Sequence, residues 1–211
     1  ENKDLSFELK NGEIVDILNS NTKVIYHKIV DQKWSATKAM NKYSNQYDIP
    51  IGNWKNIFKL FRTCLKDNTI KELQYKILHQ YIPTNKLLFQ MGKVMSNKCR
   101  FCEMYVETIE HLFFDCTHVR NIWFDIELKL YLVEKIKISL TVSDIIFGYN
   151  ISSESTFSAQ NVNINTVLLY VKNYIWKCKI AEIEVRKENV MYDIEQNMMY
   201  VPYFKRFIEV R

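Results

Sequence analysis

The chain has 211 residues, 47% of them hydrophobic, with only four glycines and three prolines. This length allows one or two domains with a buried core, and the scarcity of Gly and Pro argues against a turn-rich all-β fold. No apolar run of about 18 residues occurs, so no transmembrane helix is predicted, and the polar first ten residues do not resemble a signal peptide. Because the sequence starts at Glu1 without a methionine, we expect a piece of a longer protein.

The formal net charge of +5 is unevenly distributed along the chain. Residues 50–98 carry nine Lys and Arg against two acids, a net +7, whereas residues 99–150 carry five against eight, a net −3. Residues 1–49 are neutral, and residues 151–211 carry +1. A clustered positive segment is typical of nucleic-acid binding. A solvated helical face accounts for this charge equally well.

The first elements in chain order are a hairpin and a helix. Asn11-Gly12 lies between the apolar-containing runs of residues 5–17 and predicts a short β-hairpin with a primed turn. Apolar residues at helical spacing predict a helix within residues 22–47, and DIPIG at residues 48–52 ends it.

Three further helices are predicted before the central cysteines. Asn53 can cap the first, and either Asn68 or Thr69 can cap the second, which Pro83 ends. Thr84 starts a short third helix that Gly92 closes. The first two helices have apolar faces that comprise Trp54, Ile57, Phe58, Phe61 and Leu65, and then Ile70, Leu73, Ile77 and Tyr81.

Helical patterns continue after the cysteines, with a short helix expected over residues 107–114. A polar, Ser/Asn-rich stretch at residues 150–163 is the best linker candidate. We therefore expect a mainly α fold, divided into a connecting segment (1–52), a basic, metal-binding segment (53–149) and a linker with a long helix (150–211). Two further helices have apolar stripes that comprise Val119, Trp123, Ile126 and Leu130, and then Val167, Leu168, Val171, Ile175, Cys178 and Ile183.

Four residues have the spacing of a metal site: Cys99, Cys102, His111 and Cys116, in the pattern Cys-x2-Cys-x8-His-x4-Cys. Three thiolates and one imidazole form a closed, tetrahedral structural zinc site, whereas a catalytic zinc keeps an open position. A redox Cys-x2-Cys motif requires a βαβ pattern, which is absent from the sequence. His118 is a weaker alternative to His111, because it follows Cys116 too closely to chelate beside it.

The chain has five cysteines, an odd number, of which three belong to this motif. Cys64 and Cys178 lie in apolar helical runs and are expected to be reduced core thiols. This cysteine usage favours an intracellular protein, cytoplasmic or nuclear, over a secreted one.

The motif residues also resemble a known family. LQYKILHQYIPTNKLLFQMG, CRFC, ETIEHLFFDC and the Trp of VRNIWF are similar to the zinc-binding region C-terminal to the polymerase in LINE-type, non-LTR retrotransposon reverse transcriptases. The resemblance covers most of residues 22–180. It implies zinc ligation by the four residues above, and it includes pattern residues of less defined role, namely Gln74, Tyr75, Lys76, His79, Thr84, Asn85, Glu107 and Thr108.

The resemblance implies an accessory domain that binds template RNA, target DNA or an RNA–DNA duplex, beside the polymerase domain of the same polyprotein and without a membrane. We expect no catalysis, because the clustered carboxylates of a two-metal polymerase are missing. A zinc-stapled protein-interaction module is the alternative. Tyr75 and Tyr81 could stack on bases, but core packing explains them better. The candidate nucleic-acid contacts are Arg62, Lys71, Lys76, His79, Thr84, Asn85, Lys86, Lys93, Lys98 and Arg100.

Overall fold

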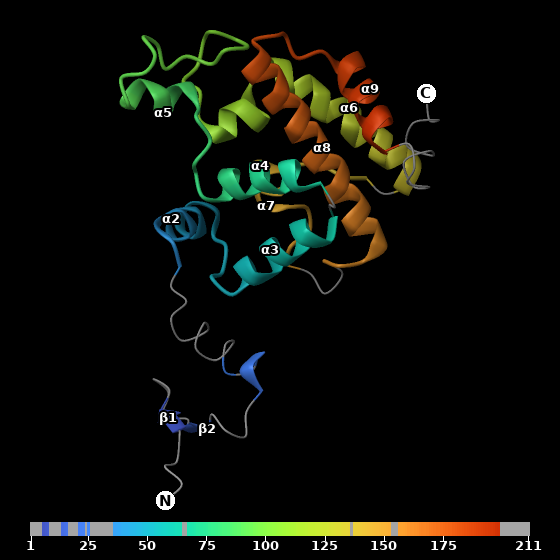
Figure 1. Ribbon diagram of the computed structural model, residues 1–211. Coiled ribbons are helices and arrows are strands. Elements are labelled where there is room, and N and C mark those ends of the chain that lie inside the picture. Colours follow the sequence, from blue (N-terminus) through green and yellow to red (C-terminus); the bar gives the residue numbers. More distant parts are fainter. Residues whose placement is uncertain are drawn as a thin grey trace, which may run out of the picture. The chain divides into compact units, whose positions relative to one another are not determined.

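The structure is a computed structural model that describes residues 6–8, 14–16, 21–23, 25, 36–64, 67–135, 137–152 and 156–198. The chain forms two compact units, residues 1–38 and residues 39–211 (Figure 1). Each unit is defined by the contacts within it. The units do not test the expected division into 1–52, 53–149 and 150–211, which stays a prediction.

In the first unit, strand β1 (Ser6–Glu8) pairs antiparallel with strand β2 (Ile14–Asp16), and Phe7 lies opposite Val15. This pairing agrees with the hairpin expected around Asn11-Gly12, whose turn lies outside the described residues. Most of the helix expected within residues 22–47 also lies outside them, up to residue 35.

The rest of the described chain is helical, which confirms the mainly α fold. No helix in the described ranges is both long enough and apolar enough to span a membrane. The helices are α2 (Lys38–Tyr47), α3 (Asn53–Cys64), α4 (Asn68–Leu78), α5 (Asn85–Gln90), the π-helix η1 (His111–Asp115), α6 (Thr117–Glu134), α7 (Val142–Phe147), α8 (Ala159–Ala181) and α9 (Lys187–Met198).

Side-chain caps fix where the helices around the basic segment begin. The Thr84 hydroxyl accepts from the backbone N–H of Leu87 at 3.3 Å, so Thr84 caps α5, which starts where the sequence predicts. The expected cap of α4 was wrong, because Asp67 caps it by accepting from the Thr69 N–H at 2.7 Å. A carboxylate at this position also suits the positive end of the helix dipole.

The end of α4 differs from the prediction in a way that affects the surface. The helix ends at Leu78, well before Pro83, and Gln80 follows with a left-handed φ of 58°. Tyr81 is therefore turned out of the apolar stripe and is 68% exposed, so its expected burial was wrong. Ile183 was also expected to be buried, but it is 53% exposed because α8 ends at Ala181.

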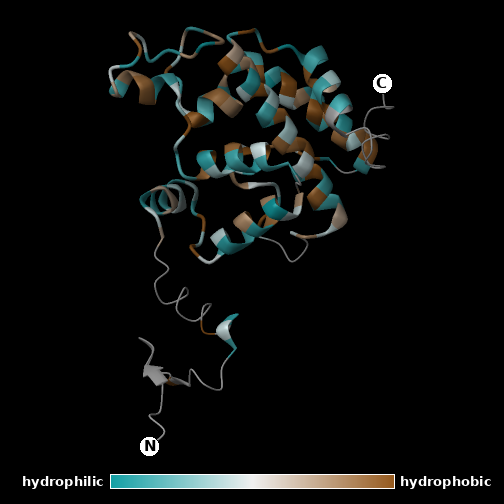
Figure 2. Ribbon diagram, viewed as in Figure 1, coloured by the Kyte–Doolittle hydropathy of each residue, from teal (hydrophilic) through white to brown (hydrophobic). Residues whose placement is uncertain are grey.

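Helix α8 is the centre of the core and packs against α3, α4, α6, α9 and η1. Hydrophobic and hydrophilic residues alternate along these helices, as in amphipathic helices (Figure 2). Val119, Trp123, Ile126 and Leu130 of α6 are all buried, as their spacing predicts. The polar stretch at residues 150–163 contains the start of α8, which Ser158 caps by accepting from the Asn161 N–H.

Candidate metal centre

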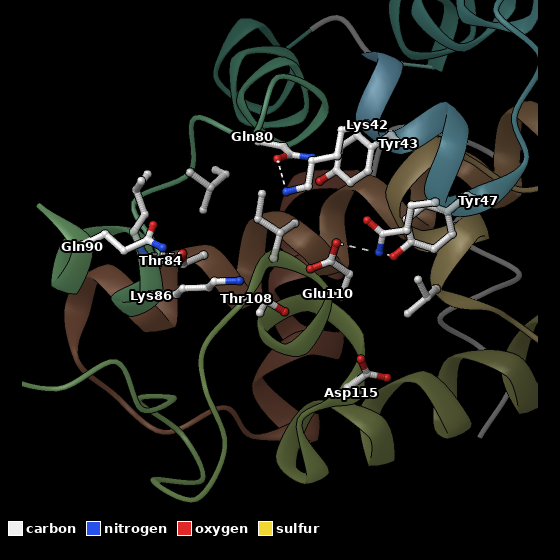
Figure 3. A pocket seen from close by; sticks show the side chains of 15 residues that line it. Lys42, Tyr43, Tyr47, Gln80, Thr84, Lys86, Gln90, Thr108, Glu110 and Asp115 are labelled. Carbon is white, nitrogen blue, oxygen red and sulfur yellow. Dashed lines mark hydrogen bonds between the residues drawn. The ribbon is translucent and has the colours of Figure 1, made fainter. Parts of the chain in front are cut away.

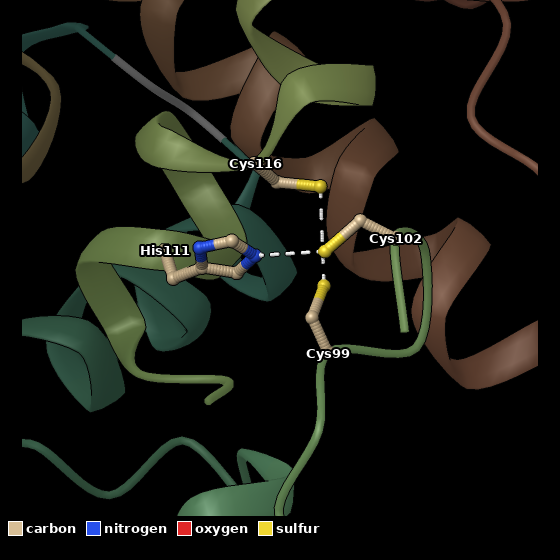
Figure 4. A group of neighbouring side chains, drawn as sticks. All are labelled: Cys99, Cys102, His111 and Cys116. Atoms are coloured by element: carbon tan, nitrogen blue, oxygen red, sulfur yellow. Dashed lines mark hydrogen bonds between the residues drawn. The ribbon is translucent and has the colours of Figure 1, made fainter. Parts of the chain in front are cut away.

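The fold brings Cys99, Cys102, His111 and Cys116 to one place, and their four ligand atoms lie within 4.8 Å of one another (Figure 4). Cys99, His111 and Cys116 are buried, and Cys102 is partly exposed. His118 lies outside this cluster and is exposed, so His111 is the histidine that faces the three sulfurs.

A tight hairpin positions the first two cysteines. Lys98 and Val106 form an antiparallel bridge, and the Cys99 N–H donates to the Tyr105 carbonyl at 2.7 Å. Glu103, which lies between Lys98 and Val106, has a left-handed φ of 57° and reverses the chain there. Backbone N–H groups of residues 101 and 102 point at the Cys99 sulfur, and donors of this kind stabilise a thiolate.

The π-helix η1 positions the other two side chains. The Cys116 N–H donates to the His111 carbonyl at 2.9 Å, a bond across five residues in place of the four of an α-helix. In an ideal α-helix, residues five apart differ by about 140° in direction. The wider turn, and the extended backbone of Cys116 (φ −62°, ψ 130°), let both side chains face the same point. The expected short helix is therefore present but is of the π type, and it ends before Cys116 as the ligand spacing requires.

Two distances test whether the cluster fits zinc. With Zn–S near 2.3 Å and Zn–N near 2.05 Å, tetrahedral ligation separates two sulfurs by about 3.8 Å and a sulfur from a nitrogen by about 3.6 Å. The Cys99 and Cys116 sulfurs are 3.9 Å apart, and the Cys102 sulfur is 3.3 Å from His111 Nε2. The donor set and its spacing therefore fit a tetrahedral thiolate–imidazole site.

The local environment favours the metal-binding protonation state at Cys116 and His111, but not at Cys99. The hydrogen bond from Cys99 lowers the pKa of Cys116, while that bond and burial raise the pKa of Cys99 itself, so Cys116 ionises more readily. Burial also lowers the pKa of His111, which keeps its ring neutral with a lone pair available.

Glu107 is fully buried and ties the cysteine hairpin to two other elements. Its carboxylate accepts from the Arg100 N–H at 3.0 Å, between the first two cysteines, and from the Asn85 N–H at 2.7 Å at the start of α5. The ammonium of Lys179, on α8, forms an ion pair with the same carboxylate. The sequence shows Glu107 only as a pattern residue of the resemblance, and nothing in it indicates Lys179.

Residues 34–123 match the family described as zinc-binding in reverse transcriptase. This part of the chain is therefore a reverse-transcriptase zinc-binding region, and the cluster lies inside it. The matched family is an accessory zinc-binding domain and not the catalytic one. Searches of curated proteins and of solved structures gave no match.

The candidate nucleic-acid contacts fall into two groups. Thr84 is buried as the cap of α5, and the N–H of Asn85 already donates to Glu107. We leave these two out of the proposed surface. Lys71 and His79 are partly buried, and the exposed basic side chains are Arg62, Lys76, Lys86, Lys93, Lys98 and Arg100.

Some exposed basic side chains have internal partners. Lys76 pairs with Glu72 at 2.7 Å, and Arg100 pairs with Glu182 at 2.9 Å. Exposed pairs of this kind contribute about 0–1 kcal/mol, so they leave the side chains available to phosphate. Gln74, a pattern residue of the resemblance, is instead buried and donates to the Ile146 carbonyl at 2.8 Å, which is a core role.

A pocket of about 540 Å³ lies beside α5 and η1 (Figure 3). Its lining mixes signs, with Lys42 and Lys86 against Glu110 and Asp115. Lys42 donates to the Gln80 side chain at 3.0 Å. Mixed charge of this kind does not favour a polyanion inside the pocket, so the candidate nucleic-acid surface is the exposed basic side chains and not this cavity.

Proposed function

We propose that this chain is an accessory domain of a LINE-type, non-LTR retrotransposon reverse transcriptase, non-catalytic itself, which binds template RNA or target DNA beside the polymerase. In this proposal Cys99, Cys102, His111 and Cys116 hold one structural zinc, whose binding energy stabilises the fold of the cysteine hairpin and η1. The observation that carries the proposal is a complete four-ligand cluster inside the region that matches reverse-transcriptase zinc binding.

Charge supports the nucleic-acid part of the proposal. The segment 50–98, with its net +7, folds into α3, α4 and α5 and continues directly into the zinc hairpin. The acids of that segment are Asp67, which caps α4, and Glu72, which pairs with Lys76. A phosphate backbone approaching these helices therefore meets an excess of positive charge.

Metal content tests the zinc assignment. Purified protein is expected to contain one zinc per chain, and Cys102→Ser is expected to lose it. Cys178→Ser is the matched control, since Cys178 is a buried thiol of α8 outside the cluster. Full zinc in the Cys102 variant, or equal loss in both variants, would refute the ligand set.

A binding titration at several salt concentrations tests the nucleic-acid part. If three to five phosphates are neutralised, the slope of log K against log salt should lie between about −2 and −5. Replacing Lys76 and Lys86 together by Gln should flatten the slope by one to two units. Lys135 and Lys137, both exposed in the acidic segment, are the matched control pair. Equal effects from the two pairs would contradict the proposed surface.

One observation favours the alternative, a protein-interaction module. Large apolar side chains are exposed around α5 and the cysteine hairpin, namely Phe89, Met91, Met95, Met104 and Tyr105. Exposed apolar patches mark contact surfaces. An affinity for RNA and DNA that is absent, or independent of salt, would favour this alternative.

A further inference from the structure

Three rings gather where α4 ends, around the imidazole of His79. The ring of Tyr75 lies 4.1 Å from that of His79, and the rings of Phe58 and Tyr81 each lie 5.9 Å from it, nearly parallel at 23°. Phe58 in turn lies 6.0 Å from the buried Trp54. A continuous row of rings therefore runs from the core to the surface.

The outer end of this row is open to solvent. Tyr75 is 52% exposed and Tyr81 is 68% exposed, whereas Phe58 and His79 are partly buried beneath them. Burial lowers the pKa of His79, so its ring is neutral near pH 7. Both outer rings keep about half or more of their surface available to a ligand.

Backbone hydrogen bonds fix the chain from which the outer rings project. Gln80, with its left-handed φ of 58°, reverses the chain directly after His79. The Tyr81 N–H then donates to the Lys76 carbonyl at 2.8 Å, and the His79 N–H donates to the Tyr75 carbonyl at 3.0 Å. Little backbone freedom is therefore left to be lost on binding, which favours affinity.

The surroundings are positively charged. On α3, Lys55 and Arg62 are exposed and lie three residues before and four residues after Phe58, on the same helix face. On α4, the exposed Lys76 follows Tyr75 in the sequence and pairs with the exposed Glu72 at 2.7 Å. Aromatic faces beside cations are the combination that binds unpaired bases and their phosphates.

We propose that Tyr75 and Tyr81, supported by His79 and Phe58, form a stacking platform for the bases of single-stranded RNA or DNA. This inference rests on the proposed function and deepens it, because it specifies unpaired bases as the ligand. A duplex hides its base faces, so the platform distinguishes single strands from duplexes. Stacking is sequence-tolerant, because every base has a flat aromatic face.

Fluorescence anisotropy with the 211-residue chain tests the platform. The probes are an oligouridine of about 12 nucleotides, the same backbone without bases, and a duplex of equal length. Tyr81→Leu and Tyr75→Leu should each weaken oligouridine binding about fivefold or more, with little change for the abasic strand and the duplex. The salt slope should not change, since neither substitution removes a charge.

Two variants complete the design. Tyr81→Phe keeps a ring and should bind as the unsubstituted chain does, and Tyr192→Leu, at a tyrosine of α9 that is 62% exposed, should have no effect. Equal losses on all three probes, or from the Tyr192 control, would overturn the platform. If the Tyr75 and Tyr81 variants bind oligouridine as tightly as the unsubstituted chain does, and binding still depends on salt, the platform is refuted and the proposed function stands. Absence of all nucleic-acid binding refutes both, and a protein occupant is then the remaining explanation.

Discussion

The buried ion pair between Glu107 and Lys179 gives the sharpest stability prediction. Glu107 is 0% exposed and the Lys179 side chain is 9% exposed, so neither charge has water to replace its partner. Glu107→Gln keeps the size of the side chain but leaves the ammonium without a counter-charge, with the Asn85 side-chain oxygen at 3.1 Å as its remaining partner. It also directs an NH2 group toward one of two backbone donors, those of Asn85 and Arg100. Breaking a buried pair in this way costs about 3–5 kcal/mol.

The same substitution should affect metal retention, because the Arg100 N–H lies within the Cys-x2-Cys turn. Outer contacts that orient metal ligands typically contribute 10- to 100-fold in metal affinity. We therefore expect Glu107→Gln to weaken zinc binding by about that factor in a competition with a chromophoric chelator.

A double-mutant cycle isolates the pair. Lys179→Met should also destabilise, and the double variant should be less destabilised than the sum of the two by about 0.5–3 kcal/mol. Glu184→Gln is the control, since Glu184 pairs with Arg186 at 3.0 Å on the surface and should contribute less than about 1 kcal/mol. Urea unfolding measures all four. If Glu107→Gln matches Glu184→Gln in both stability and zinc affinity, the reasoning is refuted.

Two further predictions concern the core. Burial lowers the pKa of Lys172 from 10.5 to about 7, so the unfolded chain binds more protons between these values, and the free energy of unfolding should rise with pH across this window by up to about 5 kcal/mol. Urea unfolding from pH 7 to 10 should show this rise, and Lys172→Met should remove it; an unchanged pH dependence would contradict the assignment. Gly148 has a φ of 105°, and a Cβ there would lie 2.9 Å from the Leu60 side chain, so Gly148→Ala should cost about 1–3 kcal/mol. Gly52→Ala, with nothing within 4 Å, should change the melting temperature little, and equal effects would show that the strain is absent.

Local patterns in the sequence predicted local features well. The ligand spacing led to a cluster that the structure assembles, and the buried stripe of α6 followed from its helical period. Thr84 was recognised as the start of the short helix α5, because helix starts depend on a few adjacent residues.

Features that depend on distant partners could not be predicted in this way. Glu107 and Lys179 are 72 residues apart, and Lys172 and Gln74 are 98 apart, so neither buried network leaves a local signal. The exposure of Tyr81 was missed for a different reason. The left-handed residue at Gln80 ends the helical period, and a non-glycine residue gives little warning of that conformation.

Zinc-edge X-ray absorption of the purified chain tests the central claim most directly, since it reports the atoms bound to the metal. Ligation by Cys99, Cys102, His111 and Cys116 predicts one zinc with three sulfurs near 2.3 Å and one nitrogen near 2.0–2.1 Å. The His111→Cys variant should give four sulfurs, whereas His118→Cys should leave the spectrum unchanged. A shell dominated by oxygen or nitrogen, or a spectrum that responds to His118 and not to His111, would contradict the account.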